Sequence, residues 1–290
     1  MIYLLFSILS ATMIFVIFKL FSRYKVNTLH AIVVNYIVAC LSGLIAFDGI
    51  IIASEIPKFS WFYYTLGLGV LFIIVFNLMA LTTQRSGLSV VSVATKMSLV
   101  IPIVFSLLYY KEQLGIFNGL GIVLALVAVY LASVKTPKGL AAPKNNMVLP
   151  LLVFLGSGII DTSIKFLEES FVAENDVPLF SATIFASAAG VGITVLVFQI
   201  INGKFRFQLK NILGGILLGV PNYFSIYFLV KALRSGILES SGIFTVNNVG
   251  VVLISTFAGI LIFKEKLLPK NWLGIILAIL SIFFVALAGI

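Results

Sequence analysis

The chain has little of what most metal proteins and redox enzymes depend on. Its 290 residues include one cysteine, Cys40, and one histidine, His30. A single cysteine excludes an intrachain disulfide and a CxxC site, and a single histidine excludes a His/Cys cluster around a metal. We therefore expect neither a metal site nor a cofactor.

Charged side chains are also scarce. Asp, Glu, Lys and Arg make up 10% of the chain and hydrophobic residues 61%, whereas a soluble domain is roughly a quarter charged and about half apolar. At about 20 residues per membrane-spanning helix, such a chain crosses a bilayer about ten times and leaves no room for an ordinary soluble domain. The composition predicts an all-α integral membrane protein and excludes secreted enzymes and DNA-binding modules. The formal charge of +9 then belongs to basic loops, not to a nucleic-acid site.

The order of apolar runs predicts ten transmembrane helices. The first run has no basic leader and is followed by Arg23 and Lys25, so we expect it to remain as a span and not to act as a signal peptide. Pro102 and Pro221 interrupt the fourth and eighth runs, and we expect a break in the eighth helix at Pro221-Asn222-Tyr223. The runs cover residues 2–21, 29–47, 61–81, 87–110, 115–134, 147–167, 179–201, 211–233, 239–263 and 271–289.

The two halves of the chain repeat one pattern. The segment KEQLGIFNGLGIVLAL begins at Lys111 and KEKLLPKNWLGIILAI begins at Lys264, with nine of sixteen positions identical. Upstream of each, Arg85-Ser-Gly recurs as Arg234-Ser-Gly. The repeat unit is therefore five helices.

A repeat of five spans places the second copy upside down relative to the first. Inverted repeats are common in secondary transporters, where the substrate site lies between the copies near the midplane. We expect a first five-helix repeat over residues 1–134, a linker rich in proline and lysine over 135–146, and a second repeat over 147–290.

Small residues recur at four-residue spacing in several spans. Such spacing lets helix backbones approach closely, and we favour packing within one chain over a dimer seam. Both a monomer and a homodimer stay open. The patterns are Gly115/Gly119, Gly215/Gly219 and Ala182/Ala186/Gly190.

The repeated motif also resembles a known family. Lys-Glu after the fourth and ninth spans, followed at a fixed distance by Asn-x-Leu-Gly-Ile-x-Leu-Ala, is similar to the hallmark of the ten-helix EamA-type branch of the drug/metabolite transporter superfamily. The resemblance covers nearly the whole chain. It implies a central cavity lined by spans 1, 3, 4, 6, 8 and 9, with spans 5 and 10 at the periphery. It leaves the substrate open, because such relatives are said to move amino acids, sugars, nucleotide sugars, organic phosphates and drugs.

Lys96 is the strongest candidate for a substrate-binding residue. It lies about 14 Å into the fourth span at 1.5 Å per residue, close to the middle of a hydrocarbon core of about 30 Å. A lysine at that depth costs about 2.5 to 3.5 kcal/mol on insertion, and it cannot easily reach the headgroups. We expect its ammonium to bind an anionic group of the substrate. The competing interpretation is a structural lysine held by backbone carbonyls or by Asp161.

Three other charged residues within the predicted spans each have their own interpretation. Asp161 and Lys165 are spaced i, i+4 on the sixth span, where an ion pair can form along one helix face. We consider them as coupling residues, with a buried structural pair as the equal alternative. Lys19 lies about two residues from the end of its span, and we expect it to snorkel to the headgroups.

Several uncharged polar residues are expected to complete the site. Aligning the two halves places Lys96 opposite a stretch of the ninth span that contains two asparagines, so polar groups of both halves meet at one depth. For any single asparagine, a hydrogen bond between helices is the alternative. The candidates are Asn77, Asn222, Tyr223, Tyr227, Asn247 and Asn248.

These features predict a secondary transporter and not an enzyme. The chain has no P-loop, no GxSxG or HExxH motif, and no pair of intramembrane carboxylates. Energy must then come from a counter-substrate or an ion gradient such as protons. We expect a small polar metabolite, an amino acid or related organic acid, carried across a bacterial inner membrane by alternating access. An exchanger of organic phosphates or nucleotide sugars is the alternative, and a channel is the rival of a different class.

Loop charges predict the orientation. Loops after odd-numbered spans hold twelve basic residues, against four near the even-numbered loops, which places the odd loops in the cytoplasm and both termini outside. The family resemblance implies the opposite orientation, and we follow the charges.

The orientation can be tested at Lys138, in the loop after the fifth span. A cysteine placed there in a Cys40→Ser background should resist a membrane-impermeant maleimide added to intact cells, because the loop is cytoplasmic. Efficient labelling from outside would reverse the assignment.

Overall fold

The computed structural model describes residues 2–45, 54–109, 115–133, 147–173, 176–233, 235 and 240–288. The linker predicted over 135–146 lies outside these residues. Within them the chain forms eleven α-helices and a short 3-10 helix, and no strand. The elements are α1 (Ile2–Arg23), α2 (Thr28–Ile45), η1 (Ile56–Lys58), α3 (Phe62–Ser86), α4 (Leu88–Met97), α5 (Val100–Tyr109), α6 (Ile116–Ser133), α7 (Val148–Phe171), α8 (Val177–Ile201), α9 (Leu209–Leu233), α10 (Ser240–Phe263) and α11 (Pro269–Ala288).

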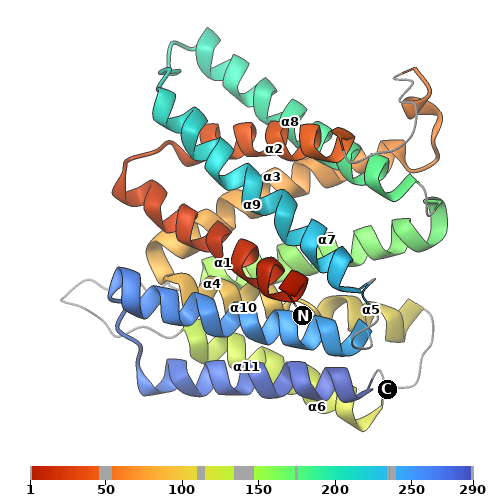
Figure 1. The fold of residues 1–290 in the computed structure, drawn as a ribbon, viewed down its shortest axis with the longest axis vertical. Helices are drawn as coiled ribbons and strands as arrows, with labels where there is room; N and C mark the ends of the chain where they lie inside the picture. The colour runs from red at the N-terminus through yellow and green to blue at the C-terminus, as the bar shows by residue number, and fades with distance from the viewer. Residues whose placement is uncertain are drawn as a thin grey trace.

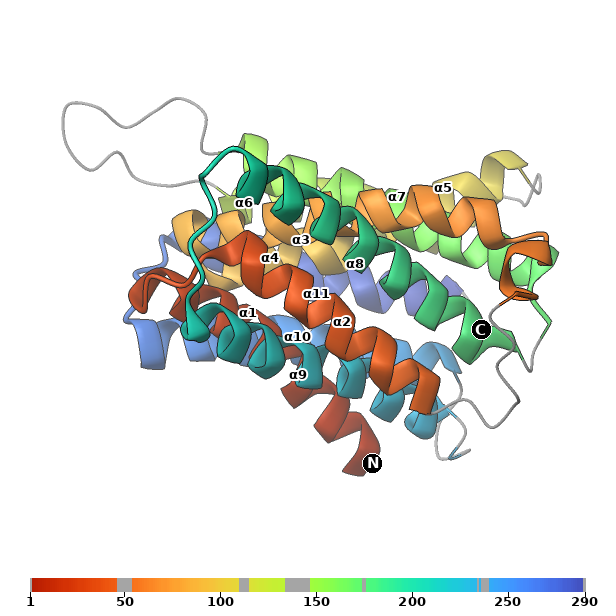
Figure 2. The ribbon, with the colours of Figure 1, turned by 90° about the horizontal axis from the view of Figure 1, so that it is seen from above.

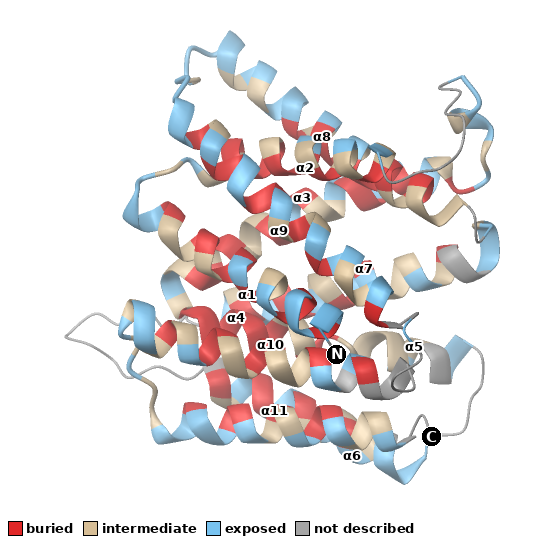
Figure 3. Cartoon of the chain, in the orientation of Figure 1, coloured by how far each residue is buried: buried red, intermediate tan, exposed pale blue. Residues whose placement is uncertain are grey.

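These helices confirm the predicted all-α integral membrane protein. In the described part of the chain, nine helices are long and apolar enough to cross a membrane, with α4 and α5 counted together as Leu88–Phe105. A shorter apolar helix, Gly119–Ala132 within α6, stands where the fifth span is predicted. Their outer faces carry large exposed hydrophobic side chains, while buried residues lie where helices face one another (Figure 3). This is the pattern of a surface that meets lipid.

The course of the chain separates two ends of the bundle. α1, α3, α8 and α10 finish at one end, on the left in Figure 1, and α7 begins there. We call it the basic end, because its loops hold most of the basic residues. Both termini lie toward the opposite end (Figure 1). α1 and α7 therefore run in opposite directions, which is compatible with the predicted inverted repeat. The loop residues at the basic end include Arg23, Lys25, Arg85, Lys204, Arg206, Lys264 and Lys266.

The helices pack in two sets that mix the two halves of the sequence. α9 packs along both α1 and α2, and α10 packs on α1; we call these four helices the front set. α3 packs on both α7 and α8, and α4 packs on α7; these four form the rear set. The two sets are joined by α2, which packs along α8, and by α10, which packs on α4. Figure 2 shows the front set below the rear set. Each set thus takes helices from both halves of the chain.

α6 and α11 pack along one another at one edge of the bundle (Figure 1). Residues of the repeated motif make this contact. A Cβ added at Gly274 would lie 2.5 Å from the Ala132 nitrogen, and Asn271 donates to the carbonyls of Leu131 and Ala132, each at 3.0 Å. The Ser281 hydroxyl donates to the Gly121 carbonyl at 2.7 Å. Asn271, Gly274 and Gly121 of the motif therefore serve helix packing.

Pro221 does not break α9, contrary to the expectation from the sequence. The helix continues from Leu209 to Leu233 with the proline inside it. A proline removes one backbone N–H and favours a kink. Packing of α9 along both α1 and α2 holds the helix together on either side of it.

Glycines allow α9 to lie against α2. A Cβ added at Gly215 would lie 2.6 Å from the Ala31 carbonyl oxygen, and one added at Gly219 would lie 2.7 Å from the Val38 Cβ. Two backbones this close leave no room for even a methyl group. The spacing Gly215/Gly219 thus serves packing within one chain, as expected.

Gly215→Ala should destabilise the fold by about 1 to 3 kcal/mol, because the methyl group must push two helix backbones apart. The purified protein should melt at a lower temperature than the parent. Gly190→Ala is the matched control, since no atom lies within 4 Å of its added Cβ. Equal melting temperatures for the two variants would contradict the packing assigned to Gly215.

Candidate functional site

The fourth span is broken directly after Lys96. α4 ends at Met97, and α5 starts at Val100. Pro102 has no N–H to offer the Ser98 carbonyl, which instead accepts a tighter bond from the Ile101 N–H at 2.9 Å. Discontinuous helices at the middle of the membrane are typical of transporter binding sites. The predicted span over 87–110 is therefore two half-helices with Lys96 near their junction.

Lys96 is a half-buried side chain in the middle of the bundle. It lies about 12 Å from the start of α4 along the helix axis. Among the described residues, its ammonium makes no hydrogen bond and no ion pair. The segment around it is densely packed, with Ser92, Val93 and Met97 fully buried. Its position along the helix is close to the one predicted from the sequence.

Asp161 is the charged neighbour of Lys96. It lies on α7, about 20 Å from the start of that helix and about 15 Å from its end. The Ser98 hydroxyl donates to Asp161 Oδ2 at 3.4 Å, so the carboxylate faces the α4–α5 junction. Its charge and that of Lys96 act on one another, yet no direct ion pair joins them in the described structure. Asp161 is also exposed, so this mid-span carboxylate remains accessible.

The sequence predicts Lys165 as the charged neighbour of Asp161, and the structure adds Lys96. The charge that acts on Asp161 belongs to Lys96 on another helix. Lys165 is exposed, one turn further along α7. Sequence spacing identifies pairs within one helix, whereas the contact between α4 and α7 arises only on folding.

A second polar cluster ties the helices of the front set together. The Ser7 hydroxyl on α1 lies 2.8 Å from the Ser225 carbonyl and 3.1 Å from Asn247 Oδ1. Asn222 on α9 donates to Asn35 Oδ1 on α2 at 3.2 Å. All five residues are buried. Two of the predicted substrate ligands, Asn222 and Asn247, thus form the interhelical hydrogen bonds that were the alternative for them.

The remaining predicted substrate ligands take no part in the hydrogen bonds of this cluster. Asn77 donates to the Ile73 carbonyl of its own helix at 2.7 Å and is half-buried. Asn248 is half-buried on α10. Tyr223 and Tyr227 stack at 6.0 Å between ring centroids, and the Lys231 ammonium lies 5.5 Å from the Tyr227 centroid. These residues remain candidates, and their contacts do not link them to Lys96.

Sequence reasoning missed several members of both clusters. Ser98 joins the Lys96 site, and Ser7, Asn35 and Ser225 join the front-set cluster. Asn35 could have been found from the sequence, because an asparagine within an apolar run needs a hydrogen-bond partner on another helix. The serines carry none, because a serine hydroxyl in a helix can bond to its own backbone.

Comparisons with known proteins agree with this fold. Residues 1–134 match the model of the EamA-like transporter family. An uncharacterized protein of Haemophilus influenzae is 31% identical over 291 residues, which is 97% of this chain and 96% of that protein. A solved crystal structure superposes with a TM-score of 0.54 at 13% identity, over 97% of this chain and 96% of its own; it shows the fold alone. The membrane-spanning helices and the family match define a membrane transporter. The chain belongs to the EamA-like transporter family.

Proposed function

We propose that the chain is a secondary active transporter that moves an amino acid, or a related organic acid, across the bacterial inner membrane by alternating access. One observation carries the proposal: Lys96 on α4 and Asp161 on α7 lie near enough for their charges to act on one another, and no ion pair joins them within the described residues. Two opposite charges held apart in this way suit a zwitterion, whose carboxylate binds Lys96 and whose ammonium binds Asp161. The bacterial relative supports the membrane.

Two charges placed at mid-span need a functional reason in a bilayer. Each charge costs several kcal/mol to bring into hydrocarbon, and one that is not fully paired retains much of that cost. A substrate with complementary charges offsets this free-energy cost when it binds. The structural alternative, in which Asp161 exists to neutralise Lys96, favours direct contact such as the 3.3 Å ion pair of Lys19 and Glu265 elsewhere in this chain.

The carboxylate of Asp161 also bears on the alternative substrates. A phosphate or a nucleotide sugar brings a phosphoryl charge without an ammonium, and Asp161 repels that charge. An exchanger of such compounds is therefore the weaker candidate. Uptake measurements distinguish a carrier from a channel. A carrier shows saturable uptake that is stimulated by substrate on the opposite side of the membrane.

Lys96→Gln should weaken amino-acid binding by about 1.5 to 3 kcal/mol, the value of a hydrogen bond to a charged group. The protein should still fold and insert, because the substitution removes a buried charge. Calorimetric titration and ligand-free melting of the same sample give both numbers. A variant that melts early yet binds with parental affinity would assign Lys96 a structural role instead.

Asp161→Asn separates the two substrate classes and tests proton coupling. It keeps the shape of the side chain but removes the partner for an ammonium, so amino-acid affinity should fall about tenfold or more. Affinity for the matching acid without its amino group should change little. Proton-gradient-driven uptake should also lose its pH dependence if Asp161 exchanges the coupling proton. Parental affinity for both ligands, with unchanged pH dependence, would exclude Asp161 from binding and from coupling.

A further inference from the structure

The front and rear sets meet closely at the basic end of the bundle. Here α1 of the front set packs against α3 and α4 of the rear set. In the five-span repeat, α1 corresponds to α7 and α3 to α9. Among the described residues, α7 and α9 make at most marginal contact. For this pair of corresponding contacts the two ends of the bundle are therefore not equivalent: α1 and α3 close the basic end, whereas α7 and α9 make no comparable contact at the opposite end in the described part of the chain.

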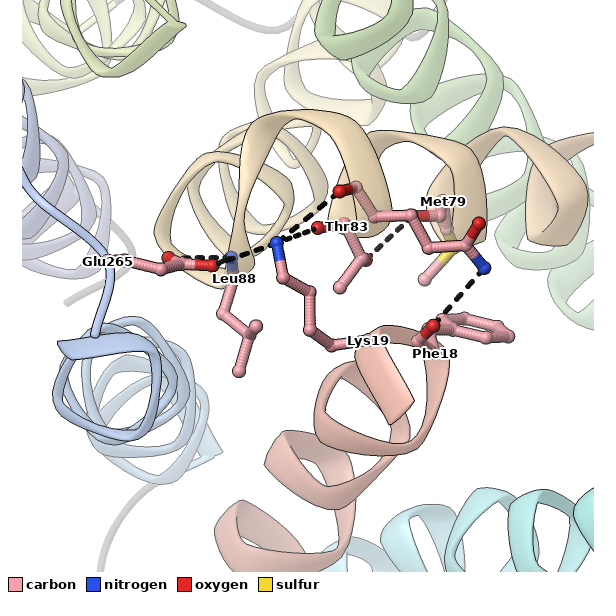
Figure 4. Close-up of polar contacts among 7 residues, drawn as sticks. Phe18, Lys19, Met79, Thr83, Leu88 and Glu265 are labelled. Carbon is pink, nitrogen blue, oxygen red and sulfur yellow. Dashed lines mark hydrogen bonds and ion pairs between the residues drawn. The ribbon is translucent and has the colours of Figure 1, made fainter. Parts of the chain in front are cut away.

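Two charged side chains make the contact at the closed end (Figure 4). Lys19 on α1 donates to the Thr83 carbonyl at 3.1 Å and to the Gln84 carbonyl at 3.4 Å, both at the end of α3. Its ammonium also lies 3.3 Å from Glu265 Oε1, in the loop after α10. Glu265 in turn accepts from the Leu88 N–H, the first residue of α4, with each oxygen at 3.1 Å.

This arrangement replaces the snorkelling expected for Lys19. The side chain is 22% exposed and reaches across to the rear set instead of out to the headgroups. All three contacts of its ammonium are with protein oxygens: two backbone carbonyls and one carboxylate. A lysine near a helix end has both options, and the choice depends on whether another helix end lies within reach.

The corner between α3 and α4 is shaped to receive the carboxylate. Gly87 forms the corner with a φ of 109°, a region that L side chains rarely adopt. A Cβ added there would lie 2.7 Å from Glu265 Oε2, and one added at Gly259 of α10 would lie 2.6 Å from the same oxygen. Glu265 thus fits between two glycines, and its negative charge stands at the positive end of the α4 dipole.

We propose that Lys19 and Glu265 form the gate that closes the basic end of the transport path. Both side chains belong to the front-set side, and both hold the α3–α4 corner of the rear set. Opening that end requires the four contacts with α3 and α4 to break together. The span that Glu265 caps is the one that carries Lys96, which links the gate to the substrate site. This inference rests on the proposed transport function, because only a carrier needs its two ends to open in turn.

The test measures how readily the basic end opens. Ser89 lies directly inside the capped end of α4 and is 3% exposed, so a cysteine there reports opening. Ser89→Cys is made in a Cys40→Ala background and treated with a membrane-impermeant maleimide, without substrate. Phe207→Cys, at a position 69% exposed in the loop after α8, identifies the basic face independently of orientation in the cell.

Lys19→Met and Glu265→Gln should each raise the rate of Ser89→Cys labelling from the basic face about tenfold or more, because each removes charge-assisted bonds that favour the closed state. Lys19→Met leaves Glu265 on the α4 N–H, so this variant keeps the helix cap. Lys19→Arg keeps the charge and should label like the parent. Labelling from the opposite face should not rise.

The other ion pair of the described structure provides the matched control. Lys58 and Glu55 lie 2.7 Å apart near η1, on the surface between α2 and α3 at the opposite end. Lys58→Met and Glu55→Gln remove the same charges and should leave labelling unchanged. Parental labelling of folded Lys19→Met and Glu265→Gln, or an equal rise from both faces, would overturn the gate. Either result leaves the binding measurements on Lys96→Gln untouched, so failure of the gate and failure of the transport function are distinguishable.

Discussion

A bilayer offers no hydrogen-bond partners, and this constraint accounts for most polar contacts inside the bundle. Thr82 and Thr83 each donate to the carbonyl four residues earlier in α3. The Tyr36 hydroxyl donates to the Phe72 carbonyl of a neighbouring helix, at 2.8 Å. A hydroxyl whose proton is used in this way has no donor left for a substrate. A mid-span charge without a hydrogen bond or ion pair is therefore informative, and within the described residues Lys96 is such a charge.

The family motif and the candidate site consist of different residues with different roles. Asn271 and Gly274 join α11 to α6, and Glu265 joins the loop after α10 to α4. These residues specify the architecture and its closed end. Lys96 and Asp161 lie outside the motif and face one another between α4 and α7. A chain can therefore resemble its family closely while the identity of its substrate depends on other positions.

Two kinds of contact hold the bundle together. Each set takes helices from both halves, so contacts between the halves are spread through the bundle and are not limited to one interface. At Gly215 the backbone of α9 lies directly against α2, which leaves no room for a methyl group. At the closed end, the packing of α1 on α3 and α4 is supplemented by the charge-assisted bonds of Lys19 and Glu265. Contacts of that kind exchange more readily than interlocked backbones, which is what a moving joint requires.

The sequence alone determined the apolar spans, the position of Lys96 along its span and the packing role of Gly215 and Gly219, because each depends on local composition or on spacing along one helix. Which groups interact was decided only by the tertiary structure. The charge of Lys96 acts on Asp161 from another helix, Asn222 and Asn247 bind other helices, and α9 continues through Pro221. Partner choice depends on which helix faces lie together, and a sequence pattern that is apolar on every side does not encode which face meets which neighbour.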